Sequence, residues 1–204
     1  NFTDNAWGGG NQFLKFVRKK LIQKKLYEEN YKEASILIIN SHHWFKHFIK
    51  FLFMRNKTII HRIDGPISAI RTNNRSAIKI DKLIYKFNNY FADGTIYQSE
   101  WSKNKNSKNG LSPHPNSIVL LNECDPEIFT PIKNKSSKKL SIVISSWSSN
   151  INKGFNTYSF IDKNLDFAKF NVTFIGNTNY NFKNIKIIQP LSSNKLSLEL
   201  SNHH

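Results

Sequence analysis

Short apolar runs alternate with helical stretches along most of this 204-residue chain. Runs of β-branched and aliphatic residues, each followed by a polar turn, are typical of parallel strands that helices cover on both faces. The alternation predicts an α/β fold with doubly wound parallel sheets, and it disfavours all-α and all-β folds. The predicted strands are residues 36–39, 58–60, 95–97, 117–121, 140–144, 172–175 and 185–188.

A connector divides this alternation into two parts. Residues 131–138 combine proline, serine and charged side chains with one isolated apolar residue, which is the composition of a linker. We therefore predict two domains, residues 1–130 and 139–204, each built around its own sheet. Both ends of the chain interrupt the pattern, so we expect a fragment of a longer protein.

Helices are predicted over residues 12–27, 43–54 and 76–91. The first carries apolar residues on one side and basic residues mostly elsewhere, which fits a surface helix or a helix resting on anionic lipid headgroups. The second has so wide an apolar face that a core position is favoured over a membrane interface. Ser99 is predicted to cap a helix start, and the polar residues 103–116 predict an exposed loop.

The cysteine content and the lengths of the apolar runs indicate a compartment. The one cysteine, Cys124, rules out an internal disulfide and makes a reducing compartment the default. No run reaches the ~18 apolar residues that span a bilayer, and no signal peptide is visible. We expect a cytoplasmic protein, with a peripheral contact at the inner face of the membrane if the basic helix binds lipid.

The segment HRIDGP, residues 61–66, follows the second predicted strand. Open α/β sheets bind ligands at the carboxyl ends of their strands, so His61, Arg62 and Asp64 form a candidate functional site. Local turn chemistry, with a Gly-Pro pair reversing the chain, is the structural alternative.

A second candidate site lies beyond the strand predicted at 140–144. A turn rich in serine and asparagine, which includes Ser148, leads to Lys153 and Gly154 at a predicted helix start. Unpaired N–H groups, the helix dipole and the lysine charge together predict a phosphate site. The three consecutive glycines at 8–10 would let the main chain approach such a ligand closely, unless they are a flexible N-terminal remnant.

These motifs, taken in order, resemble those of nucleotide-sugar glycosyltransferases of the GT-B type, in the large retaining group typified by bacterial group 1 glycosyltransferases. The resemblance rests on the glycines at 8–10, the segment 61–66, the segment 122–129 and the Lys153 turn. Residues 122–129, NECDPEIF, are similar to the family's hinge motif Asn-Gly-Val-Asp-x-x-x-Phe, and Gly176 matches a family glycine in the next strand-to-helix turn.

The resemblance implies two Rossmann-like doubly wound domains, an acceptor-side domain without its first strand and a donor-binding domain that is incomplete. The family's Glu-x7-Glu motif would lie beyond His204, so we expect the fragment itself to be inactive. Two positions depart from the pattern, since Ser148 stands where the family commonly has arginine and Glu123 replaces a glycine.

The resemblance also implies transfer of a sugar from a nucleotide-diphosphate donor to an acceptor hydroxyl, with retention. Fixed hydrogen-bond donors would stabilise the departing diphosphate, and no cofactor or metal is expected because the chain has no Asp-x-Asp motif. The expected partners are a nucleotide sugar and a glycan or lipid-linked acceptor, in polysaccharide biosynthesis. The implied residues are His61 and Asp64 in catalysis, Arg62, Asn122 and Asp125 on the acceptor or hinge side, and Gly8, Gly9, Gly10, Ser148, Lys153, Gly154 and Gly176 at the donor phosphates and sugar.

Two other functions stay open. The formal charge of +16 would suit a nucleic-acid-binding protein, but the basic residues are spread along the chain, so we expect no nucleic-acid partner. The departures at Ser148 and Glu123 would suit a non-catalytic GT-B-like scaffold. A Glu-x7-Glu motif in the sequence that follows would argue for an enzyme.

Overall fold

The computed structural model describes residues 8–45, 49, 56–70, 74–130 and 139–203. The chain divides into two compact units, which we name by their sheets. The four-stranded unit is residues 18–123, and the three-stranded unit combines residues 1–17 with 124–204. The predicted connector at 131–138 lies outside the described residues, and the predicted domain limits stay a prediction.

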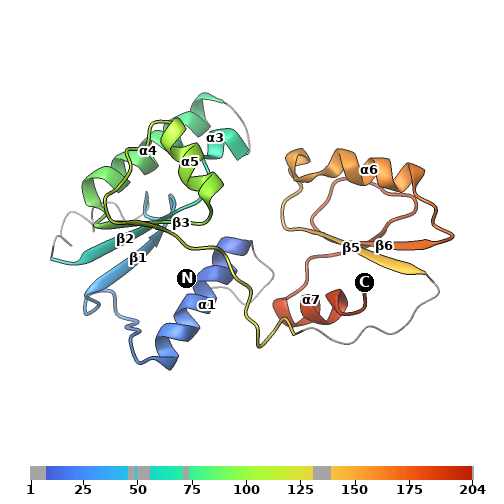
Figure 1. Ribbon diagram of the computed structural model, residues 1–204, viewed down its shortest axis with the longest axis horizontal. Coiled ribbons are helices and arrows are strands. Elements are labelled where there is room, and N and C mark those ends of the chain that lie inside the picture. Colours follow the sequence, from blue (N-terminus) through green and yellow to red (C-terminus); the bar gives the residue numbers. More distant parts are fainter. Residues whose placement is uncertain (1–7, 46–48, 50–55, 71–73, 131–138, 204) are drawn as a thin grey trace. The chain divides into compact units, whose positions relative to one another are not determined.

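The four-stranded unit is a parallel sheet covered by helices. Its elements are β1 (Ile36–Asn40), β2 (Thr58–Ile63), α3 (Ile67–Ile70), α4 (Arg75–Phe91), β3 (Gly94–Tyr97), α5 (Glu100–Lys108) and β4 (Ser117–Val119). The strands are ordered β1-β2-β3-β4, and each pairs in parallel with its neighbour. Helices α3, α4 and α5 lie together on one face of the sheet (Figure 1).

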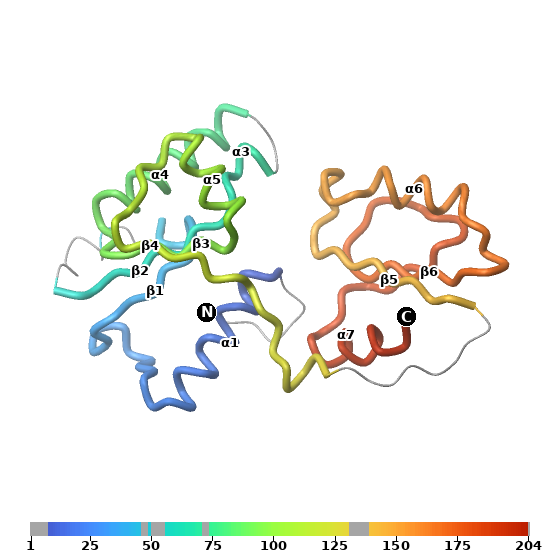
Figure 2. Tube along the Cα trace, viewed as in Figure 1, coloured from blue at the N-terminus to red at the C-terminus, as the bar shows by residue number. Residues whose placement is uncertain are grey.

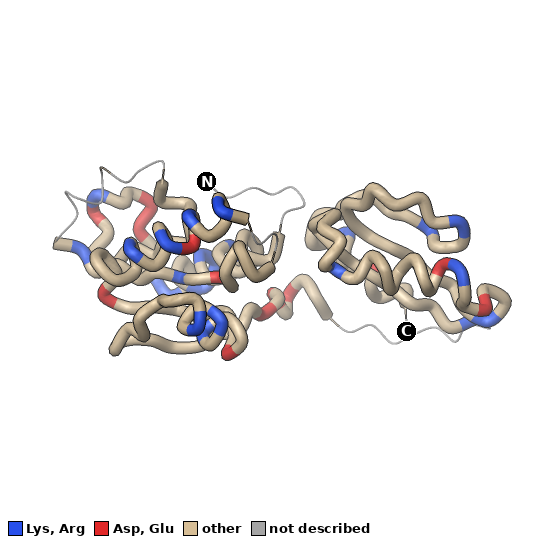
Figure 3. The backbone as a smooth tube through the Cα atoms, turned by 90° about the horizontal axis from the view of Figure 1, so that it is seen from above, with Lys and Arg blue, Asp and Glu red and all other residues tan. Residues whose placement is uncertain are grey.

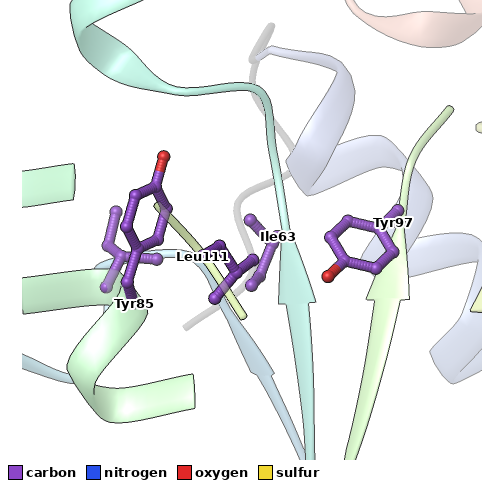
Figure 4. Packing of buried hydrophobic residues seen from close by; sticks show 5 residues of the cluster. Ile63, Tyr85, Tyr97 and Leu111 are labelled. Carbon is purple, nitrogen blue, oxygen red and sulfur yellow. The ribbon is translucent and has the colours of Figure 1, made fainter. Parts of the chain in front are cut away.

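Helix α4 supplies much of the core of this unit. Asn74 caps the helix, because its side chain accepts a hydrogen bond from the Ala77 N–H group. Apolar residues recur at three- and four-residue spacing and pack with residues of β2 and β3 (Figure 4). Burying an aliphatic or aromatic side chain of this size contributes about 1.5–3 kcal/mol. The central cluster consists of Ile63, Ile84, Tyr85, Tyr97 and Leu111.

The three-stranded unit is also built on a parallel sheet. Its elements are the start of α1 (Gly9–Gln23), β5 (Leu140–Ser146), the 3-10 helix η2 (Ile151–Lys153), α6 (Phe155–Asn164), β6 (Phe170–Gly176), β7 (Lys186–Ile188) and α7 (Ser193–Leu200). The strands are ordered β5-β6-β7. Helices α6 and α7 lie on opposite faces of this sheet, as in a doubly wound fold (Figures 1 and 2).

Helix α6 is fixed to the sheet by an apolar and a polar contact. Phe155 at its start and Phe174 of β6 are both fully buried. Asp162 near its end accepts hydrogen bonds from the N–H groups of residues 183–185, which lead into β7. Burial would raise the pKa of Asp162, but these three donors hold the pKa below its ordinary value.

The predicted α/β class with parallel sheets is confirmed, and each predicted strand is present. The loop predicted at 103–116 is wrong in its first part, because α5 extends to Lys108. The sequence pattern also misses α3 and α7, and most of the helix predicted at 43–54 lies outside the described residues. Among the helices that the structure describes, none has the length and apolar content needed to cross a membrane.

Candidate functional site

An arginine buried in β2 joins side chains from the carboxyl ends of all four strands. Arg62 has no exposed surface. Its Nη1 atom donates hydrogen bonds to Asn40 Oδ1 and Asp64 Oδ1, both at 2.6 Å. Its Nη2 atom donates to Asn122 Oδ1 at 2.9 Å and to Gln98 Oε1 at 3.3 Å. We call these five residues the arginine cluster.

The place of Arg62 follows from the length of β2. The strand continues through Ile63, beyond its predicted end, so Arg62 pairs in register with Asn40 of β1 and Ile96 of β3. Burying an unpaired guanidinium costs on the order of several kcal/mol. One carboxylate and three amide oxygens offset that cost here, and removing them would leave the charge uncompensated. The cluster is therefore a rigid base at the carboxyl edge of the sheet.

Asp64 uses one carboxylate oxygen within this cluster and leaves the other without a described partner. Its side chain is 37% exposed, and its Oδ2 atom accepts no hydrogen bond from any residue that the structure describes. Its main chain is fixed, because Asn106 Nδ2 donates to the Asp64 carbonyl at 2.9 Å. A β-carbon added at the next residue, Gly65, would lie 2.4 Å from Cζ3 of Trp101, so this turn is closely packed.

His61, the neighbour of Arg62, is buried in the interior of the sheet. It has no exposed surface, its Nε2 atom donates to the Ser41 carbonyl at 2.9 Å, and its Nδ1 atom accepts from Asn88 Nδ2 at 3.3 Å. Burial lowers the pKa of His61 to about 4, since the charged form would lose its solvation. The predicted catalytic role of His61 stays a prediction, and this geometry favours a structural role.

In the three-stranded unit, the carboxyl ends of β5 and β6 approach each other closely at Gly176. Gly176 has φ 143°, and an added β-carbon would lie 1.8 Å from the Ser146 carbonyl oxygen. The next residue, Asn177, donates from its N–H group to the Ser146 carbonyl at 3.1 Å and from Nδ2 to the Trp147 carbonyl at 2.6 Å. Only glycine fits this position without displacing β5.

The turn after β5, residues 146–154, leaves a helix start and a lysine available to a ligand. Ser148 is engaged within the turn, because its carbonyl accepts from Ser146 Oγ and its Oγ atom accepts from the Asn150 N–H group. Gly154, with φ 93°, begins α6 without a side-chain cap. Lys153 is exposed, and its ammonium group makes no ion pair or hydrogen bond with any residue that the structure describes. This arrangement favours an anionic ligand.

The predicted glycine loop is the start of α1, since Gly9 and Gly10 form its first turn. A β-carbon added at Gly8 would lie 3.4 Å from Cδ1 of Trp147, so Gly8 lies against the indole ring of the 146–154 turn. Farther along, Gln12 Oε1 accepts a hydrogen bond from Ser193 Oγ at the start of α7. The structure thus places the predicted glycines beside the predicted phosphate turn.

The hinge-like residues are divided between the two units. Asn122 belongs to the arginine cluster, whereas Asp125 makes a local turn in which its Oδ1 atom accepts from the Glu127 N–H group at 3.1 Å. Asn40 and Gln98 are not among the predicted site residues, and the available signal in the sequence is a polar residue directly after an apolar run. Among the described residues, no group of three His, Cys, Asp or Glu side chains could hold a metal ion.

No protein family model matches the chain, and no curated protein is similar to it in sequence. Among solved structures, it is similar to the crystal structure of Anabaena HepE in complex with UDP-glucose, with a TM-score of 0.60 and 11% sequence identity over 91% of this chain and 54% of that chain. This likeness confirms the predicted fold class, Rossmann-like α/β units of the GT-B type. The chain spans about half the length of HepE.

Two weaker similarities involve S. aureus MnaA with UDP and the accessory secretory proteins 1, 2 and 3 of Streptococcus pneumoniae. The MnaA match has a TM-score of 0.46 and 12% identity over 97% of this chain and 55% of that chain. The accessory secretory protein match has a TM-score of 0.45 and 11% identity over 93% of this chain and 37% of that chain. At these scores neither one bears on function.

Proposed function

We propose that the protein is a glycosyltransferase that moves a sugar from a nucleotide-diphosphate donor to an acceptor hydroxyl. The observation that carries this proposal is the contact of Gly8 with Trp147, which brings the start of α1 beside the turn that bears Lys153. Helix starts and a lysine without a described partner suit a diphosphate. The fold likeness to HepE, whose crystal structure contains UDP-glucose, supports a nucleotide sugar as the ligand.

The proposed mechanism depends on fixed charge in the three-stranded unit. Negative charge develops on the departing diphosphate as the bond to the sugar breaks. Lys153 and the N–H groups at the start of α6 would stabilise that charge, and they are already in place in the free protein. Gly8 and the first turn of α1 would let the main chain approach the phosphates. In this proposal the cation is lysine rather than a metal ion, and the sugar is transferred with retention.

The acceptor proposal is broader. We propose a glycan or lipid-linked acceptor, used in polysaccharide biosynthesis by a cytoplasmic protein. A peripheral contact with the inner face of a membrane is supported by the basic helix α1, where Ile22 is about half exposed between basic residues.

Ligand binding by this chain tests the donor site. UDP and UDP-glucose should raise the midpoint of thermal unfolding, because a ligand that binds only the folded state stabilises it. Lys153→Ala should weaken UDP binding about tenfold, since a charged hydrogen bond to phosphate is lost. Lys163→Ala is the matched control, because Lys163 is an exposed lysine in the last turn of α6, at the end away from Lys153, and its loss should leave binding unchanged. Equal UDP affinity in wild type and Lys153→Ala would overturn the phosphate assignment.

A non-catalytic GT-B-like protein is the second candidate. The engagement of Ser148 within its own turn favours it, because that residue offers no cation where the resembling enzymes commonly have arginine. Such a protein would bind UDP-glucose without turnover. Release of UDP from UDP-glucose by a longer form of the protein, in the presence of a mixed panel of glycan acceptors, would decide for the enzyme.

A further inference from the structure

We infer that the arginine cluster binds the hydroxyl groups of a sugar, with Asp64 as the residue that contacts the ligand and Arg62 as a positioning residue. The inference deepens the proposed function and rests on it for the reaction, although sugar binding can be measured without any transfer. It also separates Asp64 from His61, which the sequence pattern pairs with it.

Asp64 is more than a counter-ion for a buried arginine. Asp64 neutralises Arg62 while remaining within reach of a ligand, because its side chain is 37% exposed and Arg62 is fully buried. One of its oxygens accepts from Arg62 at 2.6 Å, and the other accepts no hydrogen bond from any residue that the structure describes. The Asn106 bond to the Asp64 carbonyl fixes the main chain below it. This leaves a single, fixed acceptor at the edge of the sheet.

The chemistry around Asp64 selects a neutral, hydroxyl-bearing ligand. A free carboxylate oxygen repels phosphate and accepts hydrogen bonds from hydroxyl groups, which both donate and accept. The exposed amide of Asn122 lies in the same cluster, where its Nδ2 atom donates to Gln98 Oε1 at 3.1 Å and its Oδ1 atom accepts from Arg62. A sugar combines several hydroxyl groups without net charge, and it could belong to the donor or to the acceptor.

Arg62 acts on the ligand only through its partners, because it has no exposed surface. Its planar guanidinium reaches Asn40, Asp64, Gln98 and Asn122 at once. A lysine ammonium is a compact charge on a flexible chain and cannot bridge side chains in this fork geometry. Arg62→Lys therefore keeps the charge and removes the positioning.

Asp64→Asn tests the contact. Asparagine keeps an oxygen for Arg62 but presents an N–H donor where the free acceptor was. We expect it to weaken sugar binding about 10- to 100-fold, measured by calorimetry with UDP-glucose and by saturation-transfer NMR with methyl glucoside, while UDP affinity stays unchanged. If Asp64→Asn weakens the binding of UDP-glucose alone, the site binds the donor sugar. If the variant loses the methyl glucoside signal, the site binds an acceptor. Unchanged binding of both probes, or no binding of either by the wild type, would overturn the inference.

Arg62→Lys tests the positioning. It should lower sugar affinity at least about tenfold in the wild type and have little further effect in the Asp64→Asn chain, because both changes act on one contact. Asp81→Asn is the matched control, since Asp81 is a buried carboxylate that accepts from the Ile67 and Ser68 N–H groups away from the cluster. It should lower the thermal midpoint without changing sugar affinity. If the losses of sugar affinity in Arg62→Lys and Asp64→Asn add in the double variant, Arg62 is only a structural residue. The same holds if Asp81→Asn loses as much sugar affinity as Arg62→Lys. If UDP fails to bind while the sugar effects hold, only the proposed function fails.

Discussion

At the scale of single residues, His61 makes the stability of the four-stranded unit depend on pH. The folded protein keeps this ring neutral, with a pKa of about 4, whereas an unfolded histidine titrates near 6.5. Between these two values the unfolded chain binds a proton that the folded chain does not, so folding weakens as pH falls. The stabilisation is complete above about pH 6.5 and is lost as pH falls toward 4, to a total of about 3 kcal/mol.

A His61→Gln chain, which cannot titrate there, should therefore lose less stability than the wild type over this range. Urea unfolding at several pH values between 7.5 and 4 measures the free energy of unfolding of both chains. The other histidines are the same in both, so their contributions cancel in the comparison. His43→Gln is the control, because His43 is exposed. Parallel pH profiles for wild type and His61→Gln would show that the buried ring does not control acid stability.

At the scale of elements, the sequence predicts where strands and helices lie but not where they end. Apolar runs locate all seven strands that the structure describes, because a strand covered by helices on both faces needs apolar side chains on both sides. The end of β2 is missed, since a buried histidine and arginine are tolerated only through long-range partners such as Ser41 and Asn122. Helix α5 is predicted to begin after Ser99, but its extent to Lys108 is missed for a related reason. Its buried residues, Ser102 and Asn106, contact β2 and the turn after it through hydrogen bonds, so no apolar stripe marks the helix.

The same limit applies to the candidate site. Arg62, Asp64 and Asn122 stand out in the sequence through their motifs, but nothing in the spacing connects them. Asn40 and Gln98 carry no signal beyond a polar side chain at the end of a run. Only the register of β1, β2 and β3 brings these side chains around one guanidinium. A single sequence contains the members of such a cluster without the pairing that joins them.

At Gly176 the ends of the paired strands β5 and β6 approach each other closely, so a side chain there should disturb their pairing. An alanine there would combine a strained backbone with a clash against the Ser146 carbonyl. We expect Gly176→Ala to lower the free energy of unfolding by more than about 3 kcal/mol and to weaken UDP binding, because the turn at 146–154 begins at that carbonyl. Gly110→Ala is the control, since Gly110 also has positive φ but an added β-carbon there meets nothing within 4 Å. Similar losses in the two variants would mean that backbone strain alone accounts for the effect.

At the scale of the whole molecule, the two units divide the chemistry by charge. The basic residues of the described chain are dispersed over both units (Figure 3), so the formal charge of +16 does not by itself single out a nucleic-acid surface. The groups available to a ligand differ in charge between the two units. The three-stranded unit offers a lysine and helix starts, which suit an anion, while the four-stranded unit offers a carboxylate on a neutralised arginine, which suits hydroxyl groups.

Hydrogen exchange measured by mass spectrometry checks this division. UDP should slow exchange at residues 8–12, 146–154 and 176–177 and leave the strand ends of the four-stranded unit unchanged, because Arg62, the cation beside Asp64, is buried and already paired. Methyl glucoside should slow exchange around residues 62–66 and 98, where Arg62 orders the chain for a hydroxyl ligand. UDP-glucose should slow exchange at residues 62–66 and 98 if the ligand of Asp64 is a donor sugar, and leave these residues unchanged if it is an acceptor. Protection of the Asp64 turn by UDP alone would contradict the division, because an anion would then be bound where the free groups are acceptors.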